Sequence, residues 1–478
     1  MTINEVRPKI QVLTPEQIKR VHETVLKILK TDGIRVDDED AKKLMVKAGG
    51  QLVDNNRIQL SEELINWAIK TAPSKIEMYD REGDLAFELN GDGSQDAVFG
   101  VGVTNLFYQN PEDDDVVPFA RKHMAVATRL GNALDQYGVV ATTGAIRDLP
   151  PETADIYGAL EMIANTRKPL ILLINDPKDF KNVLDLYEHL HGDLSKNPFI
   201  IPYFNPITPL VLNPETTAKM QESISRGIPF IFSNYGMSGA TCPITPAGTL
   251  ALLTAELLAG LVYSQLLKEH TPVILGSQPS VFDMKNMGSL LSPQYVYLNI
   301  ACAEMMNYYQ IPHAGSSGSG TGWAADILGA GTAWMNHLTS CLGKVGMAPF
   351  VGGNLDSMAF SPTLVVYANE IIRQSRQLAN GFSLDDESIG LTDISKIGPG
   401  GNYLASKLTQ QNCRDTSHIS KIWPTYSIEK WQEVGKPKAE KLLQEKTTKI
   451  LSELTAPKDH DGLIDQGEAF ISNLHPSL

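Results

Sequence analysis

The sequence is poor in cysteine: its 478 residues include only four, and no two of them form a Cys-x-x-Cys pair. Such scattered cysteines exclude a disulfide scaffold and are typical of a reducing compartment. A membrane span is also missing, because Glu256 interrupts the most apolar stretch, 249–262. The first residues, MTINEVRPKIQ, lack the apolar segment of a secretory signal. We therefore expect a soluble, cytoplasmic protein that does not bind a membrane.

Positive charge is scarce as well, with 41 Lys and Arg residues against 55 Asp and Glu residues and a net charge of -14. This balance argues against nucleic-acid binding, which needs clustered basic residues. The sequence contains no Gly-x-Ser-x-Gly elbow, no His-Glu-x-x-His pair and no P-loop lysine. No pair of residues has metal-ligand spacing, and a zinc site built from Cys242 and His313 would need ligands from distant loops. We therefore expect no metal.

The first 95 residues, 1–95, are predicted to form an extension of helices followed by a hairpin. Thr14-Pro15-Glu16-Gln17 is a capping box with proline at the first helical position. Residues 76–80 and 85–89 flank the turn Arg81-Glu82-Gly83-Asp84, which indicates two antiparallel strands.

The sequence pattern changes in residues 96–382, where eight short apolar runs alternate with segments of helical period. Nearly continuous apolar runs are typical of strands buried on both faces. Eight strand–helix units in about 285 residues match the α/β class and a closed (β/α)8 TIM barrel. An open, doubly wound sheet is the alternative, and it normally stops at about six strands. The predicted strands are 97–103, 138–145, 169–175, 199–205, 229–235, 272–278, 311–315 and 348–354.

Residues 383–478 contain no ninth repeat. They include Gly398-Pro399-Gly400-Gly401 and a charged segment, near 427–454, that is predicted to be one helix. We expect this C-terminal extension to wrap over the barrel and not to form a separate domain.

Active sites of such barrels lie at the C-terminal ends of the strands. In this sequence those positions are rich in aromatic rings, amides and small hydroxyls, and their only carboxylates are Asp176 and Asp356. Converging ring faces hold a cation that has no hydrogen to donate, such as a quaternary ammonium. The alternative is that strand aromatics fill the barrel. The rings are Phe99, Tyr108, Tyr203, Phe204, Tyr235, Trp323, Phe350 and Phe360.

Three polar residues at the strand ends each have a functional interpretation and a structural one. His313 ends the seventh predicted strand, where it would bind a substrate carboxylate, act as a base, or form a core histidine bonded to the backbone. Asn205 and Asn234 would orient polar substrate atoms or satisfy loop backbone.

The small residues Gly315, Ser316, Ser317 and Gly318 begin a Gly/Ser loop that runs to Gly322. Loops in this position of a barrel often bind phosphate. No basic residue supports that function here, because the nearest, Lys344, is over twenty residues away. Small residues would also let a bulky planar cofactor approach, and a plain flexible loop is the third possibility.

Several motifs together resemble the trimethylamine methyltransferase superfamily. They are Gly352-Gly353-Asn354-Leu355-Asp356-Ser357, Asn369-Glu370-Ile371-Ile372-Arg373, and Ile397-Gly398-Pro399-Gly400-Gly401-Asn402-Tyr403-Leu404 followed by Trp423. Family members usually carry His-Phe where this chain has Asn402-Tyr403. The founding enzymes also carry pyrrolysine, whereas this chain has only standard residues and so resembles a non-pyrrolysine member.

The resemblance implies methyl transfer from a quaternary amine, with glycine betaine as the best match and dimethylglycine as the product. The acceptor it implies is cob(I)alamin, the cobalamin cofactor carried by a cognate corrinoid protein. We assign no catalytic acid or base, because a quaternary ammonium leaves as a neutral amine, and we expect a homo-oligomer. The alternatives are a barrel enzyme acting on a phosphorylated small molecule and a non-catalytic betaine-binding protein.

Roles for the site residues follow from this resemblance. The rings are expected to surround the trimethylammonium group, three polar side chains to address the carboxylate, and the Gly/Ser loop to form the rim where the corrinoid enters. The rings are Phe204, Tyr235, Trp323, Phe350 and Phe360, the polar side chains are His313, Asn205 and Asn234, and the rim residues are Gly315, Ser316, Ser317 and Gly318.

Overall fold

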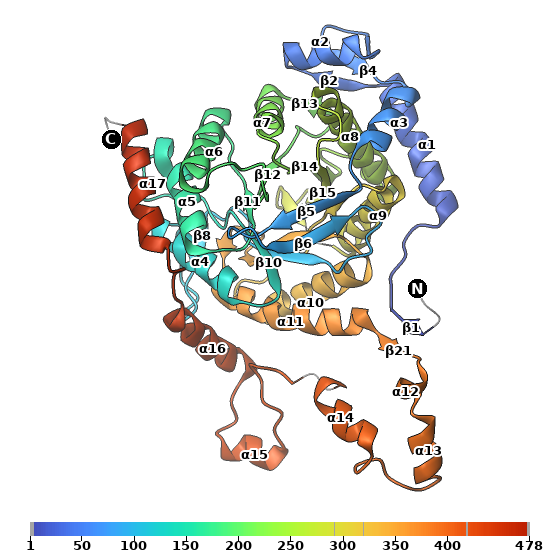
Figure 1. Ribbon diagram of the computed structural model, residues 1–478, viewed down its shortest axis with the longest axis vertical. Helices are drawn as coiled ribbons and strands as arrows, with labels where there is room; N and C mark the ends of the chain where they lie inside the picture. Colours follow the sequence, from blue (N-terminus) through green and yellow to red (C-terminus); the bar gives the residue numbers. More distant parts are fainter. Residues whose placement is uncertain (1–3, 291, 319, 417–418, 476–478) are drawn as a thin grey trace.

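The fold is a closed parallel barrel, which Figure 1 shows end-on. The computed structural model describes residues 4–475 apart from 291, 319, 417 and 418. The eight strands are joined in the order β14-β12-β11-β10-β7-β18-β17-β15, and β15 pairs with β14 to close the ring. The predicted (β/α)8 barrel is therefore confirmed. Its strands are β7 (Val98–Val101), β10 (Tyr137–Ala141), β11 (Leu170–Leu172), β12 (Ile200–Phe204), β14 (Phe230–Ser238), β15 (Val273–Asp283), β17 (His313–Ala314) and β18 (Met347–Val351).

A helix follows each barrel strand, so a ring of helices surrounds the ring of strands (Figure 1). Thr245 caps one of these helices by accepting a hydrogen bond from Gly248 N, as its position before a proline predicts. The helices are α4 (Arg121–Ala133), α5 (Pro151–Asn165), α6 (Pro177–His191), α7 (Pro214–Ser225), α8 (Pro246–Leu267), α9 (Pro293–Tyr309), α10 (Ile327–Leu342) and α11 (Pro362–Asn380).

Helix α8 is the one described helix with the length and hydropathy of a membrane span. Its apolar window is 83% buried inside the protein, between the strands and the N-terminal helices. Burial on all sides explains why its sequence is apolar all round.

The N-terminal extension contains the helices α1 (Pro15–Thr31), α2 (Glu39–Lys47) and α3 (Glu62–Thr71). Its strands β2 (Ile34–Val36), β3 (Gln51–Leu52) and β4 (Arg57–Gln59) form a small sheet with β13 (Val211–Leu212) from the loop after β12. The extension then forms the hairpin of β5 (Lys75–Tyr79) and β6 (Leu85–Asn90). Tyr79 N donates to Pro198 O at 3.0 Å, and Arg81 N to Arg167 O at 2.8 Å. Both acceptors precede barrel strands, so the hairpin covers the N-terminal end of the barrel.

At the opposite end, segments after β7 and β18 form a rim sheet in the order β19-β20-β8-β9. Strands β14 and β15 also run past their predicted ends, and β15 folds back as the antiparallel strand β16 (Gly288–Leu290). The rim strands are β8 (Phe107–Gln109), β9 (Val116–Pro118), β19 (Gly353–Asn354) and β20 (Ala359–Phe360).

The C-terminal extension leaves the barrel and returns to it. Strand β21 (Phe382–Ser383) pairs with β1 (Glu5–Val6), and four short helices follow: α12 (Asp386–Ile389), α13 (Leu391–Ile397), α14 (Lys407–Thr416) and α15 (Ile428–Glu433). Helices α16 (Ala439–Glu453) and α17 (His460–Leu474) then pack on α11 and α5. We call residues 386–435 the arm. The division of the chain at residues 95 and 382 stays a prediction.

The single helix predicted near 427–454 is wrong. The chain forms α15 and α16 instead, separated by a turn in which Gly435 and Lys436 have positive φ values of 84° and 56°. Pro437 follows this turn, and the residue before a proline avoids the helical region.

Candidate active site

Side chains that point into the barrel form one cluster, here called the inner cluster. The hairpin supplies its floor, and Tyr203 and Phe350 lie nearest the C-terminal ends of their strands. Its buried members are Ile76, Met78, Leu89, Val98, Val139, Ala141, Ile171, Ile201, Tyr203, Ile231, Ile274, Ala314, Met347 and Phe350.

Tyr203 and Phe350 form an aromatic pair at the upper level of the inner cluster. Their ring centroids lie 5.1 Å apart with planes at 78°, an edge-to-face contact. Burial raises the pKa of Tyr203 to about 12, and the neighbouring Ser233 and Asn205 side chains oppose the rise. Neither of them makes a hydrogen bond of regular geometry with the Tyr203 hydroxyl. The structure therefore places Phe350 on the inner face, together with Tyr203.

The hydroxyls of Tyr203 and Ser233 are both buried without a hydrogen-bond partner in the described part of the chain. Buried polar groups in proteins are nearly always paired with protein, water or ligand. Asn205 lies beside them, since its Nδ2 donates to Ser233 O at 3.1 Å, and its own side chain is exposed. These three residues supply neutral hydrogen-bonding groups next to the aromatic pair.

Tyr235 lies above this level on β14. It has the same parity as Ile231 of the inner cluster, so it faces the barrel mouth, and it is 40% exposed. Tyr235 acts electrostatically on Tyr295 at the start of α9, a buried tyrosine whose pKa burial raises to about 12. The Ser316 side chain of the Gly/Ser loop is also next to Tyr295. The structure thus brings Tyr235 and Ser316 together through Tyr295, a residue that our sequence analysis did not select.

Phe204 and Asn234 face away from the mouth, in contradiction to their expected roles. Phe204 contacts Phe180 of α6 and Phe230 of β14, with ring centroids 5.4 Å and 5.5 Å away. Asn234 Nδ2 donates to Leu253 O of α8 at 2.9 Å. The reason is strand geometry: successive side chains alternate between the two faces, so a neighbour of Tyr203 or Ser233 must point to the helices.

Phe360 is also removed from the substrate position. It lies under the rim sheet, fully buried, with its ring 6.2 Å from that of Tyr108 and 6.5 Å from that of Phe119. Trp323, in contrast to the buried Phe360, lies on the surface and is 70% exposed. Its backbone holds the loop, since Trp323 O accepts from Gln109 Nε2 at 2.7 Å. The buried position of Phe360 beneath other rings removes it from the expected contact with a substrate, whereas the expected contact of Trp323 stays a prediction.

His313 is a core histidine, the second of its two interpretations. Its Nδ1 lies 2.8 Å from Val345 O and its Nε2 lies 3.0 Å from Ser277 Oγ, so both ring nitrogens are occupied. Burial lowers the pKa of His313 to about 4, which keeps the imidazole neutral. The expected role of His313 in binding a carboxylate is therefore wrong.

The Gly/Ser loop is fastened to the barrel at several points. Asn299 Nδ2 donates to Ser316 O at 2.8 Å, and Ser317 Oγ lies 2.8 Å from His337 Nδ1. A Cβ on Gly318 would overlap the carbonyl oxygen of Phe350, and a Cβ on Gly315 would meet Asn299 and Val345. Gly315 and Gly318 allow close packing against the protein itself, and the corrinoid rim expected at Gly315, Ser316, Ser317 and Gly318 stays a prediction.

A phosphate site in this loop is disfavoured by Asp326. Its carboxylate caps α10 and accepts hydrogen bonds from Leu328 N at 3.0 Å and Gly329 N at 2.8 Å. A carboxylate already occupies the helix N-terminus where a phosphate would bind.

The turn after β19 contains three consecutive residues with positive φ: Leu355 at 53°, Asp356 at 55° and Ser357 at 64°. Each such residue costs about 1–2 kcal/mol in an L-amino-acid chain. Asn105 Nδ2 holds the turn by donating to Ser357 O at 2.6 Å, and Leu355 N donates to Gly322 O. Backbone strain of this kind is concentrated at functional sites, and this turn lies at the barrel mouth.

The fold and this site define an α/β barrel whose apolar inner face carries the aromatic pair of Tyr203 and Phe350 near its C-terminal end. Residues 1–475 match the trimethylamine methyltransferase (MTTB) family. The chain is 25% identical over 445 residues to trimethylamine methyltransferase MttB of Desulfitobacterium hafniense (strain DSM 10664 / DCB-2), covering 92% of this chain and 89% of that enzyme. It is also 25% identical to a glycine betaine methyltransferase of D. hafniense (strain Y51), covering 86% of each chain.

Among solved structures, the monomethylamine methyltransferase MtmB of Methanosarcina barkeri has a similar fold. The TM-score is 0.53 at 9% identity, and the match covers 94% of this chain and 89% of that one. The chain belongs to the trimethylamine methyltransferase family and is a methyltransferase.

Proposed function

We propose that this protein transfers a methyl group from a quaternary amine, with glycine betaine as the best candidate, to a corrinoid carried by a separate protein. The similarity to a glycine betaine methyltransferase supports the substrate class. The observation that carries the proposal is the inner face itself, where Tyr203, Phe350 and Tyr235 offer aromatic rings toward the mouth of the barrel. Ring faces attract a cation that cannot donate hydrogen bonds.

The chemistry needs little from the protein beyond positioning. A quaternary ammonium leaves as a neutral amine, so its departure requires no proton. The reduced corrinoid supplies the nucleophile when the carrier is bound. The rings hold the trimethylammonium group with one methyl directed outward, and the barrel wall excludes water. The hydroxyls of Tyr203 and Ser233 and the amide of Asn205 are the groups that address the carboxylate, in place of His313 and Asn234.

The direct test is to incubate the purified protein with cob(I)alamin and glycine betaine. We expect dimethylglycine, detected by mass spectrometry, together with the absorbance change of the methylated corrinoid. Carnitine and proline betaine are tested in parallel. Failure to demethylate any of the three would refute the proposed substrate class.

Replacing Tyr235 by alanine is expected to weaken glycine betaine binding about tenfold, since a cation–π contact at a partly exposed site contributes about 1.4 kcal/mol. Binding of the tert-butyl isostere, in which carbon replaces the charged nitrogen, should change much less. Isothermal titration calorimetry measures both. Tyr297→Ala is the matched control, because Tyr297 lies on α9 and is 39% exposed, like Tyr235. An equal loss for the two ligands would remove the cation–π contact from the proposal.

A further inference from the structure

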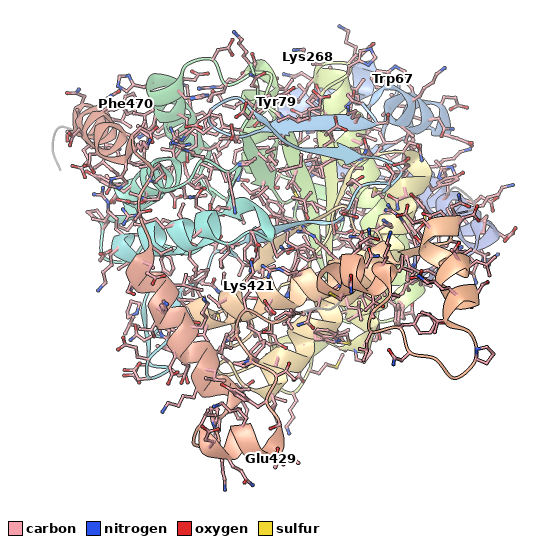
Figure 2. The ribbon with its side chains drawn as sticks, turned by 60° about the horizontal axis from the view of Figure 1, so that its bottom comes forward. Trp67, Tyr79, Lys268, Lys421, Glu429 and Phe470 are labelled. Carbon is pink, nitrogen blue, oxygen red and sulfur yellow. The ribbon has the colours of Figure 1, made fainter. Side chains whose placement is uncertain are left out.

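A small pocket lies outside the ring of barrel strands, where the C-terminal extension packs on the barrel helices. Its volume is about 150 Å³, and its walls come from the first two turns of α10, α11 and α16. Trp423 of the arm supplies one further wall. In Figure 2 Lys421, two residues before Trp423, lies over the barrel, whereas Glu429 of α15 lies at the outer edge of the molecule. This part of the arm therefore returns to the barrel and completes the pocket.

Two aromatic rings line the pocket, Tyr367 of α11 and Trp423 of the arm. Their centroids lie 5.8 Å apart with planes at 68°, so the rings form two walls at a steep angle. The Tyr367 hydroxyl donates to Ala330 O at 3.2 Å. Trp423 Nε1 donates to Ala439 O at 3.0 Å. Because both polar atoms are bonded to the backbone, the rings offer a ligand their π surfaces and no free hydrogen-bond donor.

The charged side chains of the pocket are acidic. Asp326 and Glu440 line it, and no Lys, Arg or His does so among the described residues. Asp326 is fixed in place, since its Oδ2 accepts from Trp323 N at 3.0 Å and its Oδ1 caps α10. Glu440 has no ion pair or hydrogen bond in the described part of the chain, whereas Glu445 of the same helix pairs with Lys441. The pocket therefore carries two negative charges that no basic residue of its described walls balances.

We propose that this pocket binds a small organic cation with a trimethylammonium group, such as choline. Ring surfaces attract a cation that has no hydrogen to donate, and the two carboxylates supply the opposite charge. A cavity of about 150 Å³ holds a molecule the size of benzene, which suits one trimethylammonium group with a short substituent. A zwitterion such as glycine betaine fits less well, because its own carboxylate meets two like charges. The site thus selects a different ligand from the barrel interior and goes beyond the proposed function.

Isothermal titration calorimetry with choline and its tert-butyl isostere, in which carbon replaces the charged nitrogen, tests this inference. We expect the wild type to bind choline at least about tenfold more tightly than the isostere. Glu440→Gln removes the charge and keeps the shape of an exposed side chain. This variant is expected to bind choline about fivefold more weakly, with the isostere unchanged.

Glu445→Gln is the matched control, since Glu445 is an exposed glutamate of the same helix that does not line the pocket. We expect it to bind choline like the wild type. Choline bound at the barrel mouth would be common to all three proteins, so the difference between them reports this pocket alone.

Hydrogen exchange measured by mass spectrometry locates the bound cation. Because the pocket joins the barrel helices to the C-terminal extension, we expect choline to slow exchange in residues 423–443 and at the start of α10. Trp423→Leu keeps an apolar side chain without the ring, and it is expected to lose this protection.

Four outcomes would each overturn the inference. They are equal binding of choline and the isostere by the wild type, unchanged choline affinity in Glu440→Gln, full protection in Trp423→Leu, and protection confined to the barrel mouth. None of them depends on methyl transfer, so they leave the proposed function to its own test.

Discussion

Alanine at position 318 is expected to destabilise the protein by about 3 kcal/mol, the upper part of the range for overpacking a tight site. The added Cβ would overlap the carbonyl oxygen of Phe350, and a backbone atom of a barrel strand cannot move aside cheaply. Because Phe350 pairs with Tyr203 on the inner face, the shift also disturbs the candidate site. Urea denaturation measures the first effect, and the rate of betaine demethylation measures the second.

Gly331→Ala is the matched control for this variant. Gly331 lies on α10, thirteen residues further along the chain, and a Cβ there meets nothing within 4 Å. Alanine is the better helix former, so this variant is expected to gain up to about 1 kcal/mol. Equal stability of the two variants would show that position 318 is not packed as described.

The second large effect concerns Glu256, a buried carboxyl on α8. Its oxygens accept from Thr208 Oγ1 and from Leu210 N, both at 2.8 Å, and so hold the loop after β12. Burial raises the pKa of Glu256 from its ordinary value of 4.5 to about 7, although these hydrogen bonds oppose the rise. The folded protein therefore keeps a proton that the unfolded chain has released. The resulting stabilisation is complete below about pH 4.5 and is lost as the pH rises through about 7.

The size of this loss is about 3 kcal/mol, since each pH unit between the two pKa values corresponds to about 1.4 kcal/mol. Glu256→Gln carries an amide that does not titrate, so its free energy of unfolding should fall much less over the same pH range. Urea titrations of both proteins from about pH 4.5 to above pH 7 measure the difference. Asp155, whose pKa burial raises to about 6, contributes to both proteins alike and cancels. Parallel pH profiles would contradict a buried, protonated Glu256.

The barrel could be predicted from the sequence because its evidence is repeated eight times. Each strand is buried on both faces and so gives a short apolar run, and each helix carries its own period and often its own cap, such as Thr245. Small errors in any one unit leave the count unchanged. The long hairpin of β15 and β16 was missed, because it passes beyond the barrel and lacks an apolar run of its own.

The sequence does not predict in the same way on which face of a strand a single side chain lies. An apolar run shows no alternation, so the sequence does not tell whether Tyr203 or Phe204 points inward. Tyr295 was missed for a different reason: it lies in the first turn of α9, where helical spacing suggests an ordinary core residue. His313 ends its predicted strand at the right place, but only the positions of Val345 and Ser277 reveal that both ring nitrogens are occupied.

The hairpin of β5 and β6 gives the barrel a single open end. Under the proposed function, the quaternary amine and the corrinoid of the carrier protein then reach the site through the same opening, so they cannot enter independently. The small donor has to be inside before the much larger carrier covers the opening, and the demethylated product leaves only after the carrier has dissociated. Because binding follows this compulsory order, a high concentration of the carrier protein is expected to inhibit methyl transfer. Carrier bound to the donor-free protein blocks the entry of the donor.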